Sequence, residues 1–98
     1  MRILHTGSAG TLESSDVLIT VERNPEKGLV IELESISEAR FGNRIREVIF
    51  ETLKKLQVQD VKVRVQDRSA LDCTIRARLT AAIFRAAGIE KYPWEELE

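Results

Sequence analysis

The sequence predicts an α+β domain, a two-layer sandwich in the order strand-strand-helix-strand-helix, with a flexible N-terminal arm and a C-terminal tail. Three runs of residues alternate apolar and polar side chains with a period of two, and two longer stretches repeat apolar residues at helical spacing. The 98 residues suffice for one domain with its own core. Strands with one apolar face and helices with one apolar stripe bury both by stacking in two layers.

The first two strands are expected at residues 17–22 and 29–34, where apolar residues occupy every second position. Between them, residues 24–28 read Asn-Pro-Glu-Lys-Gly, which is turn composition. The two runs are therefore predicted to pair as a hairpin. The side chains expected to face the core are Val17, Ile19, Val21, Leu29, Ile31 and Leu33.

Beyond Ser35 the period changes to that of an amphipathic helix, with Ser35 or Ser37 as its cap. Lys54 and Lys55 lie in its last turn, where cations complement the helix dipole. Its apolar stripe is expected to comprise Phe41, Ile45, Val48, Ile49, Thr52, Leu53 and Leu56.

A third strand is expected at residues 61–66, reached from the second by a right-handed crossover through the first helix. Ser69 and Asp72 stand three apart, like a capping box, and open a second helix that Gly88 terminates. The stripe expected on this helix is Leu71, Ile75, Leu79, Ala82, Ile83 and Ala86.

The chain therefore divides into a flexible arm at 1–15, a single folded domain at 16–88 and a tail at 89–98. In the tail, Pro93 and Trp94 are expected to anchor the segment on the body or on another protein. No apolar stretch approaches the length that crosses a bilayer, and the first residues carry no secretory signal. We expect a cytoplasmic protein with no membrane partner.

Composition argues against several function classes. Fifteen basic and sixteen acidic residues give a net charge of −1 without a basic patch, which argues against a nucleic-acid partner. The one histidine, His5, is interpreted as a solvated side chain, and the one cysteine, Cys73, as a small packing residue. Neither a metal site nor a phosphate-binding loop is indicated. The chain is expected to be a carrier or an adaptor and not a complete enzyme.

On the second helix, Arg76, Arg78 and Arg85 are interpreted as a solvated face, with a docking surface for an acidic partner as the alternative. Ser14 and Ser15 lie at the junction of the arm with the first strand. A serine that is modified by another enzyme must enter that enzyme's active site, so an accessible, deformable segment suits it. The alternative is an ordinary loop serine.

Four separated motifs, AGTLESSDV at 9–17, FGNRIREVI at 41–49, ALDCTIRARL at 70–79 and PWEE at 93–96, resemble the acyl carrier (gamma) subunit of citrate lyase. The resemblance covers nearly the whole chain. It implies a phosphoribosyl dephospho-coenzyme A group joined by a phosphodiester to Ser14. Some relatives carry glycine after this serine, where the present chain has Ser15.

The resemblance further implies a non-catalytic carrier subunit that presents a thiol, as an acetyl or citryl thioester, to the transferase (alpha) and lyase (beta) subunits during cleavage of citrate to acetate and oxaloacetate. A cofactor-attaching holo-enzyme synthase would be a further partner. Residues near the serine are expected to contribute to recognition: Gly10, Thr11, Leu12, Glu13 and Asp16. The alternative function is a small non-covalent adaptor that docks a partner through Trp94 or the exposed strand face.

Overall fold

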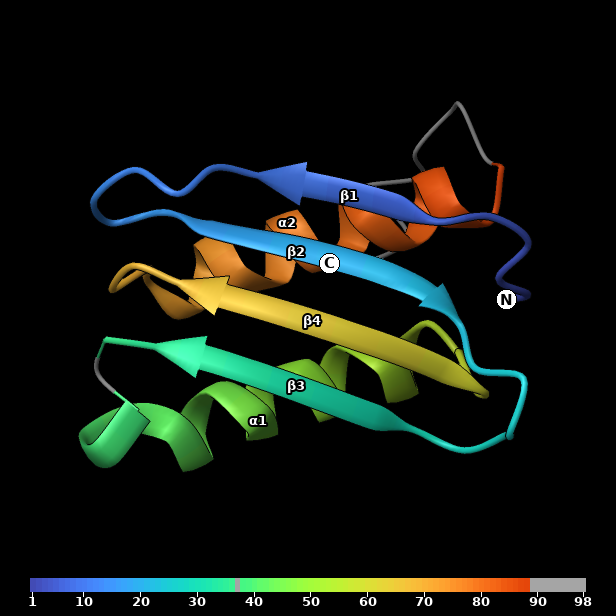
Figure 1. The fold of residues 1–98 in the computed structure, drawn as a ribbon, viewed down its shortest axis with the longest axis horizontal. Coiled ribbons are helices and arrows are strands. Elements are labelled where there is room, and N and C mark those ends of the chain that lie inside the picture. The colour runs from blue at the N-terminus through green and yellow to red at the C-terminus, as the bar shows by residue number, and fades with distance from the viewer. Residues whose placement is uncertain (37, 89–98) are drawn as a thin grey trace.

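The computed structural model describes residues 1–36 and 38–88, so Ser37 and the expected tail lie outside the described residues. It confirms an α+β sandwich of one sheet and two helices (Figure 1). The elements along the chain are β1 (Gly7–Gly10), β2 (Val17–Arg23), β3 (Val30–Ser35), α1 (Glu38–Lys55), β4 (Val61–Asp67) and α2 (Asp72–Ala86). No helix in the described ranges is long and apolar enough to cross a membrane.

The strand order is β1-β2-β4-β3, with β2 antiparallel to β4 and β3 parallel to it. The predicted hairpin between the runs at 17–22 and 29–34 is therefore wrong, because β4 lies between them. The reason lies in the connecting turn, which bonds to the residue preceding β4. Asp60 accepts the backbone N–H of Asn24 on its carbonyl (2.8 Å) and that of Gly28 on its carboxylate (2.8 Å). These bonds hold the start of β4 in the gap between β2 and β3.

The crossover from β3 through α1 to β4 is left-handed. In Figure 1 both strands point left, β4 lies above β3, and α1 lies behind the sheet. The expected right-handed crossover is thus wrong. With this strand order, a right-handed connection would place α1 on the opposite face, over the exposed Glu32 and Arg64. Burial of the apolar stripe on α1 outweighs the usual preference for the right-handed connection.

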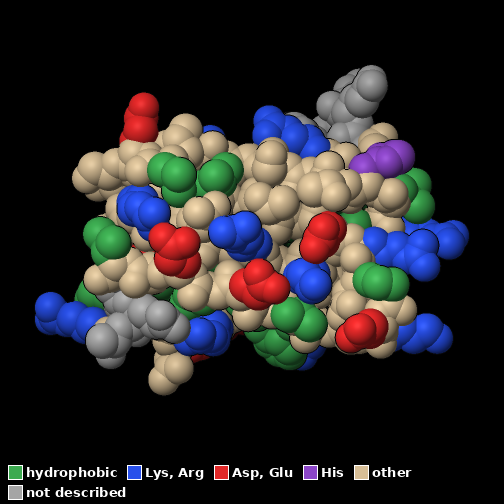
Figure 2. Space-filling view, viewed as in Figure 1, with side chains coloured by type: hydrophobic (Ala, Val, Ile, Leu, Met, Phe, Trp, Pro, Cys, Tyr) green, Lys and Arg blue, Asp and Glu red, His purple; other side chains and the backbone are tan. Residues whose placement is uncertain are grey.

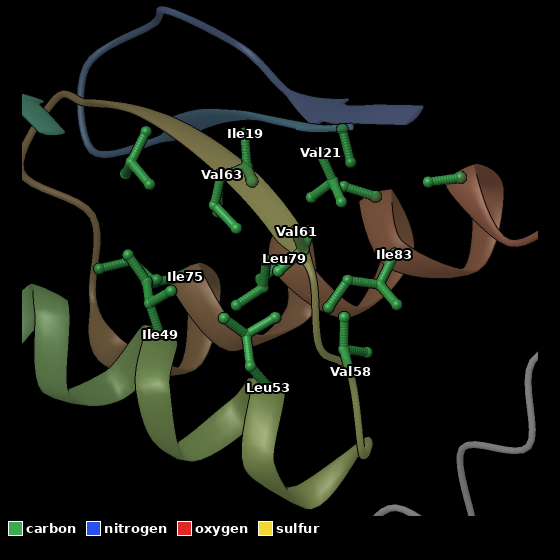
Figure 3. Close-up of a cluster of buried hydrophobic side chains, with 14 of the residues drawn as sticks. Ile19, Val21, Ile49, Leu53, Val58, Val61, Val63, Ile75, Leu79 and Ile83 are labelled. Atoms are coloured by element: carbon green, nitrogen blue, oxygen red, sulfur yellow. The ribbon is translucent and has the colours of Figure 1, made fainter. Parts of the chain in front are cut away.

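The core fills the space between the sheet and the two helices (Figure 3). The inward residues of β2 and β4 are fully buried: Val17, Ile19, Val21, Val61, Val63 and Val65. They meet Ile49 and Leu53 from α1 and Leu79 and Ile83 from α2. Burying each such side chain contributes roughly 1.5–3 kcal/mol. The opposite face of the sheet carries alternating basic and acidic side chains (Figure 2), including Glu22, Lys62 and Arg64.

The segment expected as an arm outside the body contains a strand. Gly7–Gly10 pairs along its length with β2, and Ile3 before it is buried in the core. β1 also lies very close to α2, since a Cβ on Gly7 would clash with the carbonyl oxygen of Ala82 and the backbone nitrogen of Ala86. Only glycine allows this approach.

The start of α2 differs from that expected, and the cap expected for α1 stays a prediction because Ser37 lies outside the described residues. Ser35 belongs to β3 and donates its hydroxyl to the carboxylate of Asp67 (2.8 Å). Leu71 is the N-cap of α2 and makes no side-chain cap hydrogen bond, so the Ser69–Asp72 capping box is wrong. Asp67 instead accepts the N–H of Ala70 (3.0 Å) and thereby shapes the approach to the helix.

Both expected helix stripes are buried except at their first members. Leu71 is 70 % exposed and Phe41 is 48 % exposed. Each precedes or occupies the start of its helix, at the edge of the sheet where the core ends. The C-terminus of α2 follows the expectation, since Gly88 has a φ of 75° and its N–H donates to the carbonyl of Arg85 (3.2 Å).

Candidate functional site

The candidate site is the loop of residues 11–16, which joins β1 to β2 at one end of the sheet. Glu13 to Asp16 form a turn, closed by the N–H of Asp16 donating to the carbonyl of Glu13 (3.1 Å). Ser14 and Ser15 are its two central residues, and both are exposed. Ser15 has a φ of 64°, in the left-handed region that favours glycine. A glycine at position 15 would meet the same backbone requirement.

The backbone of this turn is attached to the loop between β4 and α2. The N–H of Ser15 donates to the carbonyl of Arg68 (2.7 Å), and the N–H of Arg68 donates to the carbonyl of Asp16 (2.9 Å). The second of these bonds continues the β2–β4 ladder, whose last pair joins Val17 to Asp67. The turn is thus an extension of the sheet, and its backbone is attached to Arg68 directly after Ser14.

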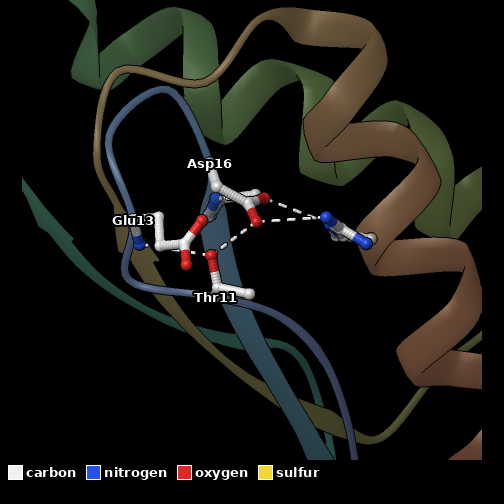
Figure 4. A network of polar contacts seen from close by, with 5 residues as sticks. Thr11, Glu13 and Asp16 are labelled. Carbon is white, nitrogen blue, oxygen red and sulfur yellow. Dashed lines mark hydrogen bonds and ion pairs between the residues drawn. The ribbon is translucent and has the colours of Figure 1, made fainter.

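Asp16 carries the side-chain contacts that fix the turn (Figure 4). Its carboxylate accepts the hydroxyl of Thr11 (2.7 Å), its neighbour Val17's N–H (2.7 Å) and two bonds from the guanidinium of Arg78 (3.0 and 3.1 Å). The side chain of Asp16 is only 14 % exposed. The hydrogen bond from Arg78, followed by that from Thr11, lowers the pKa of Asp16 from 3.8 to about 2. The carboxylate is therefore ionised and held by α2.

The residues expected to contribute to recognition lie together in this loop. Some of their side chains make internal hydrogen bonds, and others are exposed. Thr11 also accepts the N–H of Glu13 (3.2 Å), so its hydroxyl serves the internal network. The side chains of Leu12 and Glu13 are exposed and flank the serine. Gly10, with a φ of 99°, begins the loop directly opposite Leu18. Asp16 is occupied by internal contacts, which leaves Leu12 and Glu13 as the exposed side chains before the serine.

Two interpretations of the second helix need correction. Cys73 is exposed and is not a packing residue. Arg78 and Arg85 are not simply a solvated face, because Arg78 binds Asp16 and Arg85 donates to the carbonyl of Ser8 (2.6 Å). Sequence reasoning missed the role of Arg78, which lies 62 residues from its partner. No local pattern signals a pair so far apart.

The arrangement suits presentation of a hydroxyl and not catalysis by these residues. Within residues 1–36 and 38–88, Ser14 makes no side-chain hydrogen bond, and no three His, Cys, Asp or Glu side chains gather as they would around a metal. The hydroxyl of Ser14 is exposed on a turn whose backbone is fixed, so it is accessible to another molecule. Fold and site together define a small two-layer scaffold that presents an exposed hydroxyl, as a carrier protein requires.

Comparison with known proteins agrees with this class. A family model described as malonate decarboxylase delta subunit (MdcD), within the acyl carrier proteins, matches residues 5–86. Citrate lyase acyl carrier proteins of Streptococcus pyogenes serotype M4 and Streptococcus uberis are 51 % and 54 % identical. Each comparison covers 100 % of this chain and 96 % of the relative. The chain belongs to the citrate lyase acyl carrier protein family.

A solved structure shares the fold alone. Homoserine kinase from Cytophaga hutchinsonii matches with a TM-score of 0.59 and 11 % sequence identity. The match covers 97 % of this chain but only 37 % of the kinase chain. The same arrangement of strands and helices therefore occurs as part of a larger protein.

Proposed function

We propose that this chain is the acyl carrier subunit of citrate lyase and that Ser14 carries a covalently attached phosphoribosyl dephospho-coenzyme A. One observation carries the proposal: Ser14 is exposed in a turn that the hydrogen bond from Asp16 to Glu13 closes and that two further backbone bonds attach to Arg68. The full-length similarity to citrate lyase acyl carrier proteins supports the identity of the complex.

The residues around Ser14 have separate tasks in this proposal. Ser15 adopts the positive φ that turns the chain and leaves the Ser14 hydroxyl facing solvent. Asp16, through Arg78 and Thr11, keeps the turn in one conformation, so an attaching enzyme meets a pre-formed substrate. Leu12 and Glu13 provide exposed contacts beside the hydroxyl.

When bound, the group supplies a terminal thiol that holds an acetyl or citryl residue as a thioester. This chain contributes attachment and position: a tethered thiol stays at high effective concentration near two active sites. The partners proposed are the alpha subunit, which transfers the acyl group, and the beta subunit, which cleaves citrate to oxaloacetate. A holo-enzyme synthase would attach the group. We place the protein in the cytoplasm, where an exposed thiol such as Cys73 stays reduced.

The test is the intact mass of the protein isolated from its native host. The mass should exceed the sequence mass by one phosphoribosyl dephospho-coenzyme A, and Ser14→Ala should abolish the increase. Ser15→Gly is the matched control, because glycine accepts the backbone conformation of Ser15 and removes only the neighbouring hydroxyl. An increase lost with Ser15→Gly and kept with Ser14→Ala would assign the attachment to Ser15. Unmodified protein in a working citrate lyase would refute the proposal.

A further inference from the structure

We infer that an apolar groove at the attachment end of the molecule is a binding site for the thiol-bearing arm, an inference that rests on the function proposed above. The groove has a volume of about 660 Å³, within the usual range for small-molecule sites. It lies between the start of α1 and the start of α2. Its lining residues include Phe41, Ile45, Leu71, Cys73 and Ile75.

The groove and Ser14 belong to the same end of the fold. In Figure 1, the β1–β2 loop, the end of β4 and the start of α1 all lie at the left edge. Arg68, whose backbone exchanges hydrogen bonds with Ser15 and Asp16, is one residue before Ser69 on the groove wall. Cys73 also lies roughly 7.5 Å along α2 from Arg78, which holds the attachment turn. A flexible arm on Ser14 therefore reaches the groove without unfolding any element.

The surface chemistry of the groove matches an arm with an anionic part and a less polar thiol end. Leu71 and Phe41 expose 70 % and 48 % of their surface there, an unusual state for large apolar side chains in one patch. On the rim, Arg44 is paired with Asp72 (2.9 Å). Arg76 makes no side-chain hydrogen bond or ion pair with any of the described residues, so its charge is available for a phosphate of the arm.

Cys73 supplies a chemical test of occupancy, since its exposed thiol lies in the groove wall. If the arm rests in the groove, its terminal thiol lies near the Cys73 thiol. A mild azo oxidant such as diamide then joins the two sulfurs. Each thiol gives up one proton and one electron as the disulfide forms, and the oxidant takes up these two protons and two electrons to become a hydrazine.

The experiment uses the holo-protein, whose mass increase is verified first and whose acyl group is removed with hydroxylamine. Limiting diamide should give an intramolecular disulfide, seen as loss of both free thiols without dimer. The matched variant combines Cys73→Ser with Lys54→Cys, which moves the cysteine to an exposed position in the last turn of α1, at the other end of the molecule. Rates are normalised to the alkylation rate of each cysteine, so that intrinsic reactivity cancels.

The expected result is that cross-linking at Cys73 is roughly tenfold faster than at the relocated cysteine of the matched variant, because a docked arm has a raised local concentration. Leu71→Glu should remove that advantage, and Leu71→Met should retain it. Both variants change a side chain that is mostly exposed, so the fold is preserved. Equal normalised rates at the two positions, or no effect of Leu71→Glu, would contradict the inference that the arm binds in the groove. Absence of the mass increase would instead refute the proposed attachment, so the two failures are distinguishable.

Discussion

At the scale of single residues, Ser15 shows how a backbone conformation constrains the neighbour of the proposed attachment site. Its φ of 64° is open to glycine at no cost but costs other residues about 1 kcal/mol or more. Glycine also loses more entropy on folding, by roughly 0.5–1 kcal/mol. We predict that Ser15→Gly changes the free energy of unfolding by less than about 0.5 kcal/mol, whereas Ser15→Val lowers it by about 1–2 kcal/mol. Urea denaturation of both variants measures this difference. Equal free energies of unfolding for the two variants would mean that the turn changes conformation to accommodate valine.

The lowered pKa of Asp16 makes the free energy of unfolding depend on pH in the acid range. Its pKa is about 2 in the folded chain, below the ordinary value of 3.8, so the folded state holds the carboxylate more firmly ionised. This contribution is fully present above pH about 4 and is lost as the pH falls towards about 2. Its size is at most about 2 kcal/mol. Asp16→Asn should therefore flatten the fall in unfolding free energy between those pH values.

Glu13→Gln is the matched control, because Glu13 is an exposed neighbour whose carboxylate makes no hydrogen bond with the described residues. It should leave the acid limb of the stability profile unchanged. Arg78→Met removes the main cause of the low pKa and should reproduce most of the effect of Asp16→Asn. An acid limb that is the same in wild type and Asp16→Asn would show that the network contributes nothing to stability.

At the scale of elements, the closeness of β1 to α2 sets what residue 7 can be. A Cβ at this position would overlap the backbone of Ala82 and Ala86, atoms that cannot rotate away. Gly7→Ala should therefore lower the free energy of unfolding by roughly 1–3 kcal/mol, the usual cost of overpacking. Ser8→Ala is the control, because Ser8 is exposed and should tolerate the change. Equal unfolding midpoints for the two variants in urea would contradict the tight β1–α2 packing.

Some strands of the sheet could be predicted from the sequence, whereas one strand and the pairing order could not. β2, β3 and β4 were predictable because Val and Ile alternate with polar residues in each. β1 was not, since Gly-Ser-Ala-Gly contains no apolar alternation and pairs only because β2 offers a free edge. Pairing order and the hand of the crossover depend on contacts such as Asp60 with Asn24, which periodicity does not encode.

The candidate site likewise combines local sequence features with contacts between residues far apart in the chain. Ser14 is proposed from its motif and from its position beside a strand, both of which are local features. The Asp16–Arg78 pair joins residues 62 positions apart and exists only because α2 returns beside the β1–β2 loop. Exposure of Leu71 and Cys73 likewise follows from where α2 begins relative to the sheet edge, which helical spacing alone does not fix.

At the scale of the whole molecule, the centre of the sheet is bonded more extensively than its β1 edge. β4 is bonded on both sides, to β2 and to β3, whereas β1 is an edge strand of four residues. We predict that amide hydrogen exchange is slowest in β4, at Val63 and Val65, and faster at Ser8 and Ala9, because edge strands open locally at lower free energy than the core. Exchange measured on the apo protein by NMR checks this order.

The order of exchange bears on whether the attachment turn proposed here adjusts to a partner protein. If the β1–β2 end opens while β4 stays protected, the attachment turn can adjust to a partner's active site and the two-layer core remains folded throughout. Arg78→Met should increase exchange at Ser15 and Asp16, whose N–H groups close the turn, and leave Val63 unchanged. Uniform acceleration across the chain would instead show that the turn and the core open as one unit, and adjustment at the site would then require unfolding of the whole domain.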